Sequence, residues 1–204
     1  MHRICSVLAA LIVSWLTAAP ASALAGGAAT STIRRANKSI FTLLKKKVPK
    51  GSSAEKAVQV RLSKTLTAFI DFHALAERSL GKHWESRTPA EREEFVTILR
   101  DLIERNYLKT LRDNLGYRLE YRDEKVAGDK ARVRTVVKVT SNGRTEEVNI
   151  DYDMQRGKDG WRVIDVITDE VSIVRNYRSQ FNRIIRKNSY EMLVKKMRDK
   201  LKTI

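Results

Sequence analysis

The spacing of apolar residues changes twice along this chain, and these changes constrain its fold more than any other feature. Between residues 33 and 111, apolar side chains recur every three or four positions, which is typical of amphipathic helices. Between residues 117 and 165 they alternate with polar side chains, as in strands buried on one face. From residue 171 to 201 the helical spacing returns. This order predicts an α+β domain in which N-terminal and C-terminal helices flank one sheet.

The clearest helix start lies at Thr88. Thr88, Pro89 and Glu91 occupy the N-cap, N1 and N3 positions of a capping box, which predicts a long helix that stops near Gly116. A shorter helix is predicted to begin after a capping Asp71. This short helix spans residues 72–80. The other predicted helices span residues 33–44, 53–71, 171–185 and 192–201.

The alternating region predicts a four-stranded antiparallel meander. Asn142 and Gly143 form a dipeptide typical of a two-residue hairpin turn. Such a meander has one apolar face, which we expect the first and last helices to cover. Asp165 continues the alternation of Trp161 and Val163, so we expect its carboxylate on the apolar face. A carboxylate there needs a partner, which we expect to be an arginine of the C-terminal helix, with a bound ligand as the alternative. The predicted strands span residues 117–122, 132–139, 147–154 and 161–165.

Composition excludes several kinds of chemistry. The chain has 204 residues and one cysteine, Cys5, so its remainder can form no internal disulfide, thiolate zinc site or cysteine nucleophile. Beyond the first 25 residues the only histidines are His73 and His83, and no phosphate-binding glycine loop or Gly-x-Ser-x-Gly elbow is present. We therefore expect no cofactor and no metal site, and any hydrolytic mechanism would depend on one of these two imidazoles as base.

Residues 1–25 have the features of a secretory signal peptide. A short basic start precedes an apolar run over residues 4–17, and small residues allow cleavage after Ala23 or Ala25. The run is shorter than the ~20 residues of a membrane-spanning helix. We expect residues 26–204 to be exported as a single domain.

The formal net charge of +16 is concentrated in two segments. Residues 26–70 contain ten basic residues and one acidic residue, and residues 171–204 contain ten basic and two acidic residues. Export argues against nucleic acid as the partner. The basic segments are either solvated helix faces or surfaces that attract anionic lipid headgroups or acidic proteins.

Several motifs resemble the MlaC family of periplasmic phospholipid-binding proteins, also called toluene-tolerance auxiliary proteins. Segments 71–84 and 88–95 resemble the central motif of that family, and segments 159–166 and 171–187 resemble its C-terminal signature. The most specific part is Asn-Tyr-Arg-Ser-Gln-Phe at residues 176–181. Asn188-Ser189 departs from the glycine that usually follows this region.

The resemblance implies an apolar pocket between sheet and helices that holds the acyl tails of a phospholipid. It also implies a periplasmic carrier that supports outer-membrane lipid asymmetry. Its partners would be an MCE-domain protein of an inner-membrane ABC transporter and an outer-membrane lipoprotein–porin complex. Transient contact with a membrane surface is expected from the basic segments and not from the resemblance. Headgroup or partner contacts are expected from Arg175, Arg178 and Arg183. The residues expected to line the tail pocket are Leu99, Ile103, Tyr107, Val137, Val139, Ile150, Tyr152, Val163, Val174, Tyr177 and Phe181.

Three other interpretations remain open on the sequence. The carrier could bind a different lipid, such as a hopanoid. A basic docking module with a filled core would carry no lipid at all. A lipid-modifying enzyme would need His73 or His83. Periodicity alone does not distinguish a filled core from a hollow one.

Overall fold

The computed structural model describes residues 26–203 apart from 47, 50, 114–117 and 142–143, and the side chains at 107–113, 139–141 and 144–145 also lie outside the described part. The predicted signal peptide and the predicted Asn142-Gly143 turn fall outside it. The helices are α1 (Ala28–Leu44), α2 (Ser53–Phe69), α3 (Phe72–Leu80), the 3-10 helix η1 (Gly81–His83), α4 (Pro89–Asp113), α5 (Ile173–Lys187) and α6 (Tyr190–Thr203). The strands are β1 (Arg118–Ala127), β2 (Lys130–Ser141), β3 (Arg144–Gly157), β4 (Gly160–Thr168) and β5 (Val171–Ser172).

The predicted α+β class and the antiparallel meander are confirmed. The strands follow the order β1-β2-β3-β4-β5, and every neighbouring pair is antiparallel. The sheet has five strands instead of the predicted four. The additional strand, β5, consists of only Val171 and Ser172, which is too short to produce an alternating pattern in the sequence.

The predicted capping box at the start of α4 is also confirmed. The Thr88 amide donates to Glu91 Oε2 at 2.7 Å, and the Glu91 amide donates to Thr88 Oγ1 at 3.3 Å. These reciprocal bonds satisfy two amides that no intrahelical carbonyl can reach. Hydrogen bonds from Thr88 hold the pKa of the Glu91 carboxyl below its usual value.

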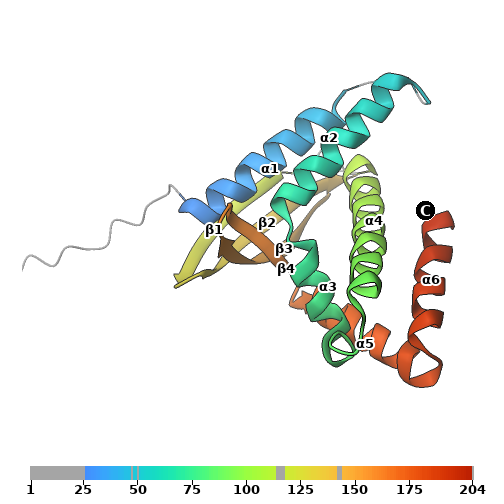
Figure 1. The fold of residues 1–204 in the computed structure, drawn as a ribbon. Helices are drawn as coiled ribbons and strands as arrows, with labels where there is room; N and C mark the ends of the chain where they lie inside the picture. Colours follow the sequence, from blue (N-terminus) through green and yellow to red (C-terminus); the bar gives the residue numbers. More distant parts are fainter. Residues whose placement is uncertain (1–25, 47, 50, 114–117, 142–143, 204) are drawn as a thin grey trace, which may run out of the picture.

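The helices form two groups around the sheet (Figure 1). α1 lies across the inner face of the sheet and α2 packs along α1, so these two form an antiparallel hairpin. α3 packs against both α4 and α5 at the other side of the molecule. The last helix was expected to cover the sheet, but α6 packs on α4 and α5 instead.

A bulge in β1 attaches α1 to the sheet. The pairing between β1 and β2 shifts between Tyr121 and Asp123, so that Glu124 comes to lie opposite Val133. Glu124 Oε2 accepts a hydrogen bond from the Thr30 amide at 2.8 Å, in the first turn of α1. A carboxylate at this position interacts favourably with the positive end of the helix dipole. One turn later, the guanidinium of Arg34 lies 4.9 Å from the centre of the Tyr121 ring.

A second bulge corrects the prediction for Asp165. Met154 pairs with Val163, whereas Asp153 pairs with Asp165, so Ile164 is the extra residue. Asp165 therefore lies on the face opposite to Val163. Its carboxylate is buried, and it accepts hydrogen bonds from the Ser172 hydroxyl at 2.5 Å and from the Val174 amide at 3.1 Å. The expected shared face and the expected ion pair with an arginine were both wrong, because the bulge turns Asp165 toward the start of α5.

Ion pairs across neighbouring strands cover the outer face of the sheet. The pairs are Arg132 with Asp153 at 2.6 Å, Arg134 with Asp123, and Lys138 with both Glu120 at 3.2 Å and Glu147 at 3.0 Å. Opposite charges facing each other across strands contribute modestly to stability when they are exposed. Their larger consequence is that four of the eight acidic residues in the strands are already paired with basic residues of the sheet.

Candidate functional site

The inner face of the sheet is densely packed at one end and partly open at the other. β2 and β3 pair in successive rows, from Ala131–Met154 and Val133–Tyr152 to Thr135–Ile150 and Val137–Val148. The side chains of the first two rows are buried, and Val133 and Met154 are 0% exposed. Ile150, Val137 and Val148 are partly exposed although they lie on the same face.

Neighbouring strands show the same change. Leu119, which pairs with Val137, and Tyr121, which pairs with Thr135, are both partly exposed. On β4, Val163 is fully buried, whereas Val166 is partly exposed. At this end of the sheet, apolar side chains of the inner face are therefore partly accessible to solvent.

Along the long helix α4, the exposure of apolar side chains also increases from one end toward the other. Phe95 and Leu99 are 0% and 1% exposed, while Ile103, one turn further on, is partly exposed. The next residue, Glu104, accepts a hydrogen bond from the Ser63 hydroxyl of α2 at 3.1 Å. α4 therefore runs from a filled core toward the same partly open region, where it meets α2.

We expect a Glu104→Gln variant to be more stable than the wild type at neutral pH. Partial burial raises the pKa of the Glu104 carboxyl above its reference value of 4.5. The folded state thus favours the protonated form, so the stability from this group is present below pH 4.5 and is lost as pH rises through the raised pKa. Glutamine keeps an acceptor for Ser63 without the charge.

Urea unfolding of the variant and the wild type, at several pH values between about 4 and 7, measures the difference in their free energies of unfolding. The stability gap between variant and wild type should grow as pH rises from about 4 to 7. A gap that stays constant with pH would show that ionisation of Glu104 does not oppose folding. A Glu93→Gln variant, at a position on the same helix, serves as the matched control.

Those predicted pocket residues whose side chains the structure describes fall into two groups, one partly exposed and one buried. Ile103, Val137, Ile150 and Tyr177 are partly exposed. Tyr107 and Val139 lie in α4 and β2, but their side chains are outside the described part. The remaining residues are buried in close packing, namely Leu99, Tyr152, Val163, Val174 and Phe181.

Phe181 and Tyr177 belong to an aromatic cluster between helices. The Phe181 ring stacks on Tyr177 at 5.3 Å between centroids and meets Phe95 edge-on at 5.6 Å. Phe95 in turn contacts the Tyr190 ring at 6.3 Å. These contacts join α4, α5 and α6. Burial also raises the pKa of the Tyr177 hydroxyl above its ordinary value.

The three predicted headgroup residues are exposed on α5, and two of them bind backbone carbonyls. Arg178 Nε donates to the Arg78 carbonyl at 2.8 Å, which ties α5 to α3. Arg175 Nη2 donates to the Glu170 carbonyl at 3.3 Å, close to the start of the same helix. Arg183 is exposed as well.

The two histidines make structural contacts. His83 Nε2 lies 3.0 Å from the Asn182 amide oxygen, which connects η1 to α5. The His73 ring packs edge-on against Trp84 at 5.3 Å. Within the described residues, no group of three or more histidine, cysteine or acidic side chains is arranged to hold a metal ion.

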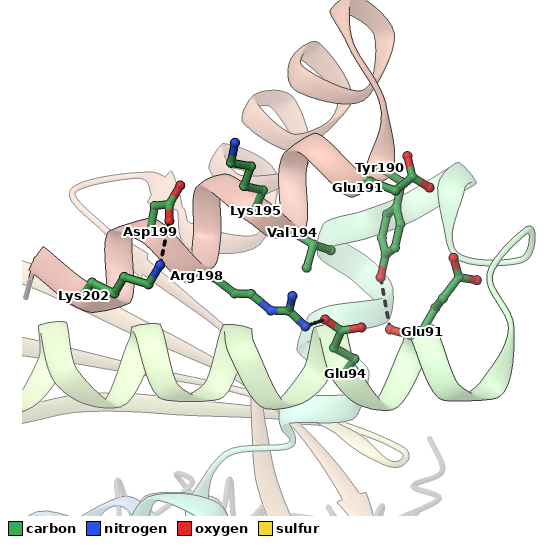
Figure 2. A pocket seen from close by; sticks show the side chains of 9 residues that line it. All are labelled: Glu91, Glu94, Tyr190, Glu191, Val194, Lys195, Arg198, Asp199 and Lys202. Carbon is green, nitrogen blue, oxygen red and sulfur yellow. Dashed lines mark hydrogen bonds and ion pairs between the residues drawn. The ribbon is translucent and has the colours of Figure 1, made fainter.

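A cleft of about 430 Å³ lies between α4 and α6 (Figure 2). Glu94 of α4 and Arg198 of α6 point toward each other and form an ion pair across it. The Tyr190 hydroxyl donates to the Glu91 carbonyl at 3.0 Å, and burial raises the pKa of that hydroxyl to about 12. With four acidic and three basic side chains in its lining, the cleft is unsuited to acyl tails.

Sequence analysis missed four of the partly exposed apolar residues on the inner face. Three of them belong to the predicted alternation, but nothing in that pattern distinguishes a covered position from an open one. The fourth, Val166, lies beyond the predicted strand 161–165 and reaches the inner face only because of the bulge at Ile164. The four residues are Leu119, Tyr121, Val148 and Val166.

Every helix in the described part of the chain is too short or too polar to cross a bilayer. The family model described as MlaC protein matches residues 34–199. The intermembrane phospholipid transport system binding protein MlaC of Haemophilus influenzae is 22% identical over 134 residues, which cover 65% of this chain and 63% of that protein. The match thus spans less than two thirds of that relative.

A solved structure shares the fold. It is that of a phospholipid-binding protein from Ralstonia solanacearum in complex with a phospholipid, with a TM-score of 0.73 and 22% identity. The match covers 87% of this chain and 98% of that one. The resemblance inferred from the motifs is confirmed by the family model, which matches most of the chain. This chain belongs to the MlaC family.

Proposed function

We propose that this protein is a periplasmic phospholipid carrier. It would move lipid between an outer-membrane lipoprotein–porin complex and an MCE-domain protein of an inner-membrane ABC transporter, and so support outer-membrane lipid asymmetry. The observation that carries the proposal is the change along the inner sheet face, from buried rows to partly exposed apolar rows. Membership in the MlaC family and the phospholipid in the related solved structure support the nature of the cargo.

The energetics explain why a carrier of this kind needs no catalytic chemistry. Two acyl tails contain roughly 30 methylene groups, and exposing them to water would cost about 24 kcal/mol at ~0.8 kcal/mol each. Free diffusion of a phospholipid through water is therefore negligible. A protein cavity as apolar as the bilayer makes the transfer nearly neutral, so the direction of transport would depend on the partners.

The proposed tail site lies between the open end of the sheet and α4. Ile103, Val137 and Ile150 would contact the tails directly, with Leu119, Val148 and Val166 beside them. Tyr107 and Val139 remain part of the proposal. The closely packed residues, including Leu99, Tyr152 and Val163, would form the closed wall behind the tails. Arg175, Arg178 and Arg183 remain candidates for headgroup or partner contact.

Native mass spectrometry of the purified mature protein tests the proposal. We expect a bound mass that corresponds to a diacyl phospholipid, identified by organic extraction and lipid analysis. A bound polycyclic lipid would mean that the protein is a carrier with a cargo other than phospholipid. Folded protein that is free of lipid and takes none from vesicles would overturn the proposal and favour a docking module with a filled core.

A further inference from the structure

Exposed basic residues without an acidic partner lie on both helices of the hairpin formed by α1 and α2. Arg35 and Lys38 of α1 and Arg61 and Lys64 of α2 are all exposed, and we call these four residues the hairpin face. In the described part of the chain, none of the four forms an ion pair with an acidic residue. Glu55, the one acidic residue of α1 and α2, accepts a hydrogen bond from the Gly51 amide at the far end of α2.

The packing of the hairpin places these charges on the same side of the molecule. The hydroxyls of Ser39 and Thr65 meet at 3.5 Å on the exposed side of the contact between α1 and α2. Arg35 lies one turn from Ser39, and Arg61 lies one turn from Thr65, so both residues flank this contact. Lys38 and Lys64 adjoin Ser39 and Thr65 in the sequence and are exposed beside them.

The composition of this surface fits a membrane better than a protein partner. The cores of protein interfaces are enriched in aromatic residues and arginine and depleted in lysine, whereas the hairpin face combines two lysines with its two arginines and has no aromatic residue. The one aromatic residue of α2, Phe69, is buried, whereas Val60 is 54% exposed one turn before Lys64. Long basic side chains around a small apolar residue can extend to headgroups while their methylene stems remain near the acyl boundary.

Charge elsewhere in the protein does not oppose this contact. The acidic residues of the outer sheet face are largely held in cross-strand ion pairs, and they lie on the side of the sheet opposite to α1 (Figure 1). These residues therefore do not cancel the field of the hairpin face, which extends about 10 Å into solution at ordinary salt. On the helical side, Glu104 of α4 lies close to α2, but it is partly buried and hydrogen-bonded to Ser63.

We propose that the hairpin face binds directly to the anionic phospholipid surface of a membrane. The inference rests on the proposed function in one respect: the complexes that the proposed carrier would serve are embedded in membranes, so their partner would work beside a lipid surface. It adds which surface makes that contact and which lipid chemistry is recognised. The bound headgroups would be those of the bilayer surface, and they are distinct from the lipid held as cargo.

Flotation with vesicles tests this inference on the whole mature protein. The first variant replaces Arg35, Lys38, Arg61 and Lys64 with glutamine. The control replaces four exposed basic residues of α5 and α6, namely Arg186, Lys187, Lys196 and Lys200, so that the net charge falls by the same amount. Vesicles are made of phosphatidylcholine with or without phosphatidylglycerol, and native mass spectrometry records the lipid cargo of each protein.

Each basic residue near an anionic leaflet strengthens binding by ~fivefold, so we expect the hairpin variant to bind at least about tenfold more weakly. The control should bind nearly as well as the wild type, and vesicles without phosphatidylglycerol should bind neither. Equal losses in the two variants would reduce the effect to net charge and overturn the inference. Wild-type protein that carries lipid but ignores anionic vesicles would also overturn it, while the proposed function would stand.

Discussion

Replacement of Ile150 with tryptophan should strongly reduce the phospholipid that remains bound to the purified, folded protein. Ile150 lies on β3 at the transition from the buried rows to the partly exposed rows. The larger ring would occupy space that we assign to an acyl tail. Overpacking of about 1–3 kcal/mol corresponds to a roughly 5- to 150-fold loss of affinity. Quantitative lipid extraction, together with native mass spectrometry, measures the change.

The matched control adds the same ring outside the proposed site. Val126 lies on β1 and is 53% exposed, so a Val126→Trp variant should keep its full lipid content. Circular dichroism establishes that both variants fold. If the folded Ile150→Trp protein carries as much phospholipid as the control, Ile150 does not line the tail site.

Replacement of Asp165 with alanine should destabilise the protein by about 3 kcal/mol, because the Ser172 hydroxyl and the Val174 amide would lose a charged acceptor in a buried position. For a protein of this size, such a loss lowers the melting temperature by roughly 6–12 °C. Asp165→Asn should cost less, since its amide oxygen can still accept one of the two bonds. Urea unfolding at neutral pH gives the free energies.

Asp159 provides the comparison for Asp165. It is exposed in the turn between β3 and β4, and its replacement with alanine should change stability by less than about 0.5 kcal/mol. Similar losses in the Asp159→Ala and Asp165→Ala variants would mean that the buried hydrogen bonds at the start of α5 contribute no special stability.

Features that depend on neighbouring residues were predictable from the sequence. The capping box at Thr88 was found in the expected positions, because its hydrogen bonds involve residues only three apart. Asp71 also accepts a bond from the Ala74 amide, as expected for the cap of α3. The alternation of apolar residues likewise identified β1 to β4, since one face of each strand is buried.

Features that depend on pairing between strands were not predictable in this way. The bulge at Ile164 inserts one residue into β4 and reverses the face of every later side chain. The only local sign was the adjacent pair Val163 and Ile164, both of them buried, which an ordinary alternating strand does not produce. Asp165 was misplaced for this reason.

The candidate site raises a related problem. Val133 and Val137 occupy equivalent positions in the alternation of β2, yet the first is fully buried and the second is partly exposed. Their difference arises from what lies above the sheet, which depends on the lengths and directions of α1 and α4. The composition of a strand carries no such information, and the family resemblance was needed to predict a pocket at all.

The free edge of the sheet has a consequence if the protein alternates between lipid-loaded and empty states, as the proposed function requires. An unpaired strand edge is a template for association with other chains, and uncovered apolar surface increases that hazard. β1 forms this edge, and it combines a bulge with charged residues at most positions between Arg118 and Lys125. Such an edge resists the addition of another strand. In the proposed carrier, this edge would protect the empty form from aggregation between the release of one lipid and the uptake of the next.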